Sequence, residues 1–265
     1  VYKRQEEWQG NFVADLRQRP LRPVKVRWNR FCCLTHSPEM DFYAAFYYIP
    51  PMQCWMLLGG KNPLEANSWK RLCDLPKQES PYLFLDQRPR WFGRYLCFGD
   101  RQSATILTMN PQGVERVQRF PLPKAQHPCR FACDGLGRIL LAHDEETYCF
   151  ENGSLSPLGF HILSGDGFNG SIPVPGTGRL VMCGFSDREL VARLLELDVD
   201  TRRCRTARMQ NVDPWSNLLP FGDDWVLIKG TCDSMRLDFA RLWNRTTGEV
   251  LRIRPGMFGS EKLEH

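Results

Sequence analysis

The chain has 265 residues, of which 42% are hydrophobic, enough for the core of one large all-β domain or of two ordinary domains. Pro50 and Pro51 divide its richest apolar stretch, FYAAFYYIPPMQCWMLLGG, into two expected strands, so no membrane span is predicted. The net charge is +5, but eight positive charges lie near the N-terminus, at Lys3, at Arg4 and at six positions within 16–30. The rest of the chain therefore carries a net charge of −3, which makes nucleic acid an unlikely partner for it.

The first five residues, VYKRQ (1–5), match codon for codon one reading frame of GTGTATAAGAGACAG, the transposon end used to fragment DNA for sequencing. We therefore expect residues 1–5 to come from a sequencing adapter, and the natural chain to continue upstream of Glu6 with other residues. On this hypothesis the chain is truncated at its N-terminus, so its start gives no information about targeting.

Residues 6–30 form a separate region, interpreted as a basic arm or a partial blade. Its charges lie in LRQRPLRPVKVRWNR, which contains no acidic residue. Alternation of charged residues with Val24, Val26 and Trp28 favours a strand with one solvated face. The alternative is an arm that contacts nucleic acid or another anionic partner, and the candidate contact residues are Arg19, Arg22, Lys25 and Arg27.

A faint repeat runs through residues 31–265. Four apolar runs each begin with Gly, namely GRYLCFGD, GRILLAHD, GRLVMCGFSD and GDDWVLIKGTCD, and their first residues are Gly93, Gly137, Gly178 and Gly222. The intervals are 44, 41 and 44 residues. An earlier run, CWMLLGGKN (54–62), lies about one period upstream and is expected to belong to a first, less regular unit.

Each unit contains four short apolar segments joined by turn residues. After each Gly run come ATILTMNPQG, ETYCFENG, RLLELDVDTR and ARLWNRTTG, and then VERVQRFPL, SLSPLGFHI, RCRTARM and EVLRIR. The segments PYLFLD, PCRFACD, GSIPVPG and SNLLPFG precede the glycines. Four strands per 40–45 residues predict an all-β fold, a β-propeller of about five four-stranded antiparallel blades over residues 31–265.

Two segments are similar to known propeller repeats. ARLWNRTTGEVLRI (240–253) resembles the end of a WD-type blade, although Asn244 replaces the usual Asp and no Gly-His pair precedes it. LLGGKNPLEANSWKRLCDLP (57–76) is similar to a kelch repeat, with a short Gly-to-Trp spacing and no intervening Tyr. These resemblances imply propeller blades and do not identify one family.

Cysteine and histidine do not form a convincing metal motif. His127, Cys129 and Cys133 are the best cluster, but strand alternation places the two cysteines on one face as core residues, so no metal site and no cofactor are predicted. Most of the 11 cysteines lie in apolar runs, which favours buried reduced thiols and a cytoplasmic protein over disulfides in an exported one.

Acidic residues recur after the Gly runs, at Asp100, Asp144, Asp187 and Asp233. We expect them to accept backbone N–H groups in turns; the alternative is a ring of carboxylates that binds a cation. His143 and Glu146 are expected to be solvated residues of a hairpin.

Basic and aromatic residues recur beside the same runs. Arg94, Arg138 and Arg179 either begin strands as solvated side chains or line a channel rim and contact an anion. Trp91, Trp215 and Trp243 either pack between blades or contact a partner.

The predicted function is that of a binding or scaffolding module that contacts a protein partner through blade loops on one face. No catalytic residue is assigned, because the sequence contains neither GxSxG nor a nucleophile with a local partner. The alternative is a hydrolase or lyase whose active site lies at the mouth of a propeller channel.

Overall fold

A computed structural model describes residues 11–13, 24–26, 31–49, 54–63, 66–75, 89–125, 128–144, 146–159, 171–186, 191–208, 217–222, 224–229 and 240–253. The described chain is almost entirely β-structure, in two compact units. One unit comprises residues 1–98 and 105–118, and the other residues 99–104 and 119–265. No helix in the described part is long and apolar enough to cross a membrane.

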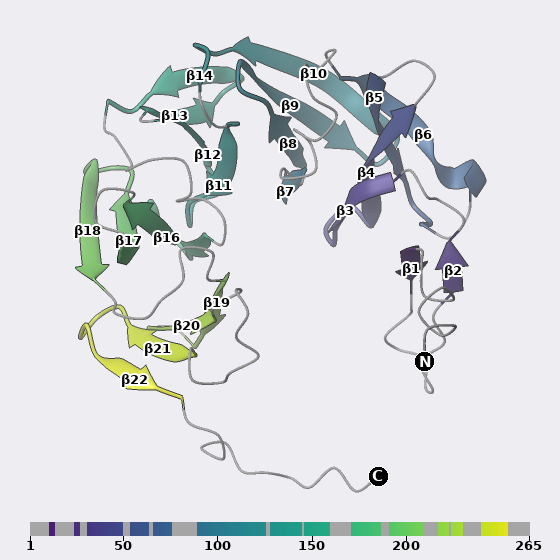
Figure 1. Cartoon of the computed structure of the whole chain (residues 1–265). Coiled ribbons are helices and arrows are strands. Elements are labelled where there is room, and N and C mark those ends of the chain that lie inside the picture. The colour runs from purple at the N-terminus through teal and green to yellow at the C-terminus, as the bar shows by residue number, and fades with distance from the viewer. Residues whose placement is uncertain are drawn as a thin grey trace, which may run out of the picture. The chain divides into compact units, whose positions relative to one another are not determined.

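Five four-stranded antiparallel sheets confirm the predicted all-β propeller and its number of blades. Each sheet is built from four strands that are consecutive in sequence (Figure 1). The first sheet contains β3 (Phe31–Ser37), β4 (Phe42–Ile49), β5 (Cys54–Gly60) and β6 (Lys70–Asp74), with the short 3-10 helix η2 (Ala66–Ser68) before β6. The second contains β7 (Arg90–Phe92), β8 (Tyr95–Gly99), β9 (Ser103–Asn110) and β10 (Gly113–Pro121).

The other three sheets follow the same order. They are formed by β11 (Arg130–Cys133), β12 (Ile139–His143), β13 (Glu146–Glu151) and β14 (Ser154–Pro157); by β15 (Ile172–Val174), β16 (Arg179–Ser186), β17 (Val191–Asp198) and β18 (Arg203–Arg208); and by β19 (Asn217–Phe221), β20 (Trp225–Lys229), β21 (Arg241–Asn244) and β22 (Val250–Arg252). A further pair, β1 (Asn11–Val13) with β2 (Val24–Val26), confirms the strand expected over Val24–Val26.

The Gly runs mark the second strand of each of the last four sheets. Gly93, Gly137 and Gly222 adopt positive φ angles of 55°, 82° and 68° in the turn before that strand, a conformation that side chains with a Cβ rarely adopt. In these three units the repeat in the sequence is therefore a repeat of turn geometry followed by the second strand, whereas Gly178 has no positive φ angle.

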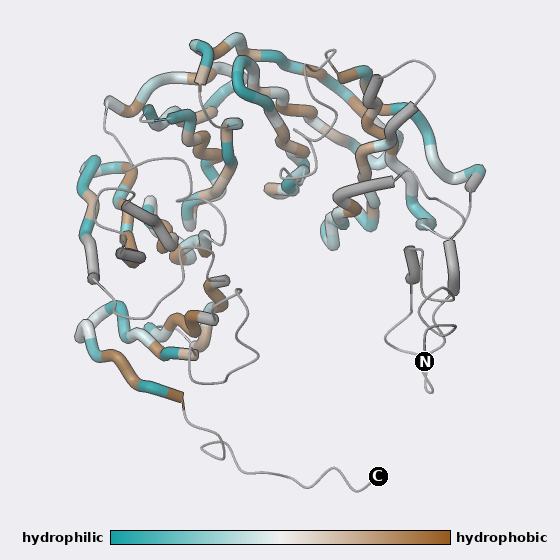
Figure 2. Tube along the Cα trace, in the orientation of Figure 1, coloured by the Kyte–Doolittle hydropathy of each residue, from teal (hydrophilic) through white to brown (hydrophobic). Residues whose placement is uncertain are grey.

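The middle strands supply the core. Every residue of β12 is buried, whereas the last strand of the same sheet, β14, has no buried residue. The apolar residues of neighbouring sheets interdigitate: Leu140 and Cys149 pack with Leu180, Met182 and Leu197. Hydrophobic stretches coincide with strands along the described chain (Figure 2). Neighbouring sheets also contact through their first strands, β11 with β15 and β15 with β19.

The structure differs from the sequence-based expectation in two strands and in the burial of His143. CWMLLGGKN was aligned with the Gly runs, but it forms β5, the third strand of its sheet, because β4 already occupies the second position. β7, at Arg90–Phe92, is the first strand of the second sheet, and PYLFLD (81–86) lies outside the described residues. His143, expected to be solvated, is only 4% exposed because it is the last residue of the fully buried strand β12, and its Nε2 lies 3.2 Å from the carbonyl oxygen of Arg101.

Two leucines four residues apart test the position of the core. Leu140 is fully buried between two sheets, whereas Leu136 lies in the β11–β12 turn and is 56% exposed. Leu140→Ala is expected to lower the free energy of unfolding by about 3 kcal/mol, since it opens a cavity. Leu136→Ala is expected to change it by less than about 0.5 kcal/mol. Urea unfolding followed by fluorescence measures both, and equal losses would contradict the fold.

Candidate binding face

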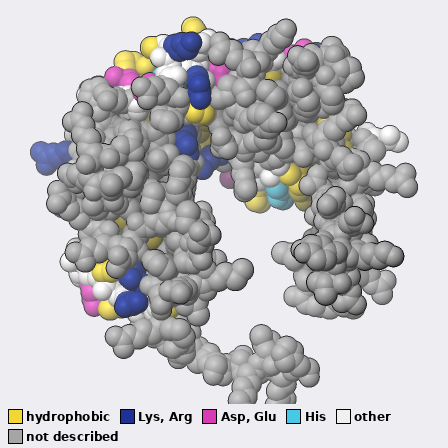
Figure 3. All heavy atoms as spheres, viewed as in Figure 1, with side chains coloured by type: hydrophobic (Ala, Val, Ile, Leu, Met, Phe, Trp, Pro, Cys, Tyr) yellow, Lys and Arg dark blue, Asp and Glu magenta, His cyan; other side chains and the backbone are white. Residues whose placement is uncertain are grey.

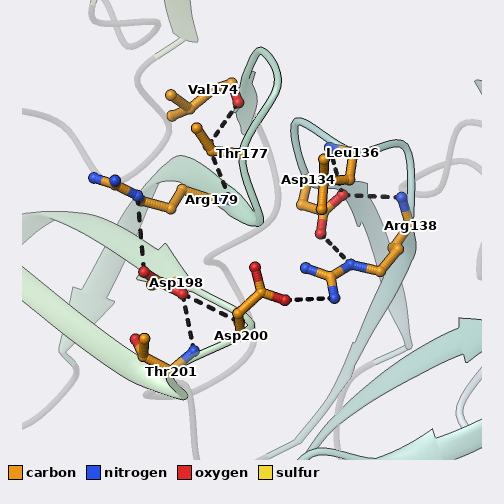
Figure 4. A network of polar contacts seen from close by, with 9 residues as sticks. All are labelled: Asp134, Leu136, Arg138, Val174, Thr177, Arg179, Asp198, Asp200 and Thr201. Atoms are coloured by element: carbon orange, nitrogen blue, oxygen red, sulfur yellow. Dashed lines mark hydrogen bonds and ion pairs between the residues drawn. The ribbon is translucent and has the colours of Figure 1, made fainter.

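The best-defined polar site lies where the third and fourth sheets meet at their turns. We call it the turn cluster and define it as residues 134–138, 174–179 and 198–202, from the β11–β12, β15–β16 and β17–β18 turns. Two arginines and three aspartates face one another there (Figure 4). The cluster lies wholly within one compact unit.

Asp134 organises the first turn. Its side chain is completely buried, and its Oδ1 accepts the backbone N–H groups of Leu136 at 3.0 Å and Arg138 at 2.9 Å. Its Oδ2 accepts Nε of Arg138 at 2.6 Å. A buried carboxylate requires such partners because removing it from water is costly. The turn is therefore fixed by its own side chain.

Arg138 connects this turn to the next sheet. Its Nη1 lies 2.7 Å from Oδ1 of Asp200, which belongs to the β17–β18 turn. Burial lowers the pKa of the Arg138 guanidinium, but hydrogen bonds and charge attraction from Asp200 and Asp134 outweigh that effect and raise it above its usual value. A Cβ on Gly178 would collide with both members of the Arg138–Asp200 pair, so a glycine leaves room for it.

Backbone hydrogen bonds join the turns as well. Gly135 donates its N–H to the carbonyl of Arg179 at 3.1 Å and accepts the N–H of Gly176 at 3.1 Å. The N–H of Val199 is donated to the carbonyl of Gly178 at 2.8 Å. The three turns thus form one hydrogen-bonded assembly.

The second arginine pairs within its own sheet. Arg179 lies 3.3 Å from Glu196 through Nη1 and 3.7 Å from Asp198 through Nε. The backbone N–H of Thr201, the largest influence, lowers the pKa of the Asp198 carboxyl, with smaller contributions from Asp200 and Arg179. The acidic groups near Arg179 are therefore already engaged.

The remaining basic and aromatic candidates are placed as follows. Arg94 is exposed, with its guanidinium 5.5 Å from the centre of the Tyr95 ring. Lys25 is in β2, and Arg19, Arg22, Arg27 and Trp215 lie outside the described residues. Trp91 is half-buried and meets Phe42 edge-on at 6.2 Å. Trp243 is 6% exposed and packs among Val181, Val226 and Ile228. The roles of Arg94, Arg138 and Arg179 in anion binding remain predictions.

Asp100 accepts backbone N–H groups as expected, from Gln102 at 2.8 Å and Ser103 at 2.7 Å. Asp187 and Asp233 lie outside the described residues, as does His127. Cys129 is buried with its Sγ 3.5 Å from the carbonyl oxygen of Ser103, and burial raises the pKa of its thiol. Within the described ranges no His, Cys, Asp and Glu side chains gather as a metal site would need.

Sequence reasoning missed Asp134 and the Asx turns that end several third strands. Asn110, Asp198 and Asn244 each accept two backbone N–H groups from the turn that follows, at 2.8–3.1 Å. The signal was present, because an Asn or Asp occurs at the equivalent point in MNPQG, LDVDT and WNRTTG. Asn244 thus performs the turn-capping role despite replacing Asp.

No protein-family model and no curated protein matches this chain. Solved β-propellers do resemble it. The β-propeller domain of the Trilobed protease from Pyrococcus furiosus, described as having an open velcro topology, aligns with a TM-score of 0.56 and 12% identity over 92% of this chain and 74% of that one. A putative 6-phosphogluconolactonase from Bacteroides fragilis aligns with a TM-score of 0.57 and 12% identity over 92% and 75%. TolB from Acinetobacter baumannii aligns at 0.50 and 11% over 91% and 61%. Such identities show the fold alone.

The docking of the turns depends on the absence of a side chain at Gly135. A Cβ there would overlap the carbonyl of Val174, which cannot move without shifting β15, so Gly135→Ala is expected to cost about 3 kcal/mol of stability. Gly137→Ala is the matched control, because its Cβ would meet open space and only its φ of 82° is strained, at a cost of about 1 kcal/mol. Denaturant unfolding of both variants measures the difference. An equal or larger loss for Gly137→Ala would refute the docking.

Proposed function

We propose that the chain is a binding or scaffolding module that contacts a protein partner through blade turns on one face. The observation that carries this proposal is Leu136. Its backbone N–H is held by buried Asp134, yet its side chain is 56% exposed at the tip of the turn cluster. An apolar side chain on a backbone that is already ordered costs less conformational entropy to bind, which favours it as an interface anchor.

A second apolar side chain occupies the corresponding end of the last sheet. Phe221 is 47% exposed where β19 meets its turn. That turn is also held, because the N–H of Arg245 is donated to the carbonyl of Asp224 at 2.8 Å and Oγ1 of Thr246 to its carboxylate at 2.9 Å. Equivalent turns of successive repeats belong to one face of a repeat protein, which is commonly its binding face.

The described side chains are of mixed type. Figure 3 shows basic, acidic and hydrophobic side chains intermixed among those in view. Arg138 and Arg179 of the turn cluster are paired with Asp134, Asp200, Glu196 and Asp198. The anchors proposed here are therefore apolar, with a polar surround, which is the usual composition of a protein interface.

The alternative function is that of a hydrolase or lyase with an active site at the channel mouth. It is supported by His143 and Glu146, which pair across the β12–β13 hairpin, and by the buried Oε1 of Glu146, for which the described residues supply no hydrogen-bond partner. Buried titratable groups are a feature of active sites. Two of the similar structures are the β-propeller domain of a protease and a putative lactonase, at an identity that supports only the fold.

Surface substitutions separate the two functions. Partners cross-linked to the tagged chain in cells and quantified by mass spectrometry are expected to fall at least tenfold for the double variant Leu136→Asp/Phe221→Asp, because a charge in an apolar contact costs more than 1.4 kcal/mol. Val117→Asp is the matched control, since Val117 is similarly exposed (43%) on β10 and lies outside these turns.

Unchanged capture by the double variant would contradict the binding proposal. Turnover of an ester or lactone probe by the purified chain, abolished by Glu146→Gln and unaffected by the turn variants, would establish the enzyme instead.

A further inference from the structure

The last strand of the fourth sheet, β18, is rich in arginine. Its sequence RCRTAR contains three arginines and no acidic residue, and Arg202 precedes it. The last strands of the other sheets differ. β6 and β10 include Asp74 and Glu115, β14 has no charged residue, and β22 has a single arginine.

The positions of Arg203 and Arg205 explain why they remain unpaired. In the register of β17 with β18, Arg203 lies opposite Asp198, and Arg205 lies opposite Glu196. Both acids are engaged by Arg179, on the far side of β17. Arg202, Arg203 and Arg205 are exposed, and none of them forms an ion pair within the part of the chain that the structure describes.

β18 is also the end of its sheet. The order is β15–β16–β17–β18, and β17 pairs with β18 from Arg203 to Arg208 along one edge only (Figure 1). Among the described strands none pairs with its other edge. An edge strand presents N–H and C=O groups that can bond to an added extended chain.

From this edge and its charge we propose that β18 binds an acidic, extended segment of a protein partner, which adds a fifth strand to the sheet. Arg203 and Arg205 are two residues apart and on one face of the strand, as acids at alternate positions of an extended peptide would be. Opposite charges across neighbouring strands stabilise the pairing, and like charges destabilise it. The same arginines therefore oppose pairing of β18 with a second copy of itself.

The proposal does not depend on the exposed Leu136 and Phe221, and it is tested with peptides of defined sequence. Fluorescein-labelled VEVEVEVE is titrated with the purified chain, and anisotropy is read at low and moderate salt. VKVKVKVK reverses the charge of the probe. VEVEPEVE keeps the acidic residues but removes a backbone N–H and disfavours strand pairing. An oligothymidine of similar charge tests nucleic acid.

The wild-type chain is expected to bind VEVEVEVE at least ten times more tightly than the lysine or proline peptide. Arg203→Glu/Arg205→Glu is expected to raise the Kd for VEVEVEVE at least tenfold and to bind VKVKVKVK instead. Arg116→Glu/Lys124→Glu changes the net charge equally at two exposed positions outside β18 and is expected to leave both affinities within twofold. Reversing the charge of the strand in Arg203→Glu/Arg205→Glu should also reverse which peptide it prefers. A variant that only failed to fold would bind neither peptide, so misfolding cannot produce this result.

Equal binding of VEVEVEVE by wild type and Arg203→Glu/Arg205→Glu would overturn the proposal. Equal affinity for the proline peptide would overturn strand addition, since attraction would then be by charge alone. Tighter binding of oligothymidine that requires Arg203 and Arg205 would assign the edge to nucleic acid. The variant Leu136→Asp/Phe221→Asp should bind VEVEVEVE as the wild type does. Failure of the proposal for β18 can therefore be distinguished from failure of partner binding through Leu136 and Phe221.

Discussion

The contact on which the arrangement of the third and fourth sheets depends is the docking of the Asp134 turn against the β15–β16 and β17–β18 turns. Apolar burial between these sheets supplies most of the stabilisation, but it is non-directional and would tolerate many mutual angles. The polar contacts are directional. Buried Asp134 holds Arg138, Arg138 reaches Asp200 in the neighbouring sheet, and Gly135 brings the two backbones into hydrogen-bond contact.

This docking also connects structure to the proposed function. The groups that fix the turn point inward, so the side chain of Leu136 is left at the surface on a backbone that is already ordered. Neither Arg138 nor Arg179 is free of acidic partners, in contrast to Arg203 and Arg205 one strand further out. One region of the molecule thus presents an apolar turn and, separately, a basic edge. The two surfaces suit different contacts.

Much of the fold could be predicted because its determinants are local and periodic. Gly at the turn and a continuous apolar run recur at intervals of 41–44 residues, and an Asn or Asp ends three of the third strands. Errors arose where the period weakens. β5 resembled a Gly run because it is apolar and ends in Gly59–Gly60, although β4 before it takes the second position. The first strand of the second sheet is only Arg90–Phe92, too short to give a strand pattern.

The candidate site was harder to predict because its contacts are distant in sequence. Arg138 was selected from the Gly-Arg repeat, but nothing local indicates that Asp200, 62 residues later, lies 2.7 Å from it. His143 looked like a hairpin residue, and only folding places it against the carbonyl of Arg101. Function is less accessible still, since one fold hosts many functions, and the propellers with about 12% identity to this chain include the β-propeller domain of a protease and a putative lactonase.

A double-mutant cycle across the two sheets measures directly whether the Arg138–Asp200 pair holds the turns together. Arg138→Met, Asp200→Asn and the double variant are unfolded in urea, and the coupling energy between the two positions is calculated from their stabilities. A favourable coupling of about 1 kcal/mol or more is expected, because the pair bridges neighbouring sheets at 2.7 Å beside a buried carboxylate. Additive losses, with a coupling below about 0.3 kcal/mol, would show that this contact does not hold the turns.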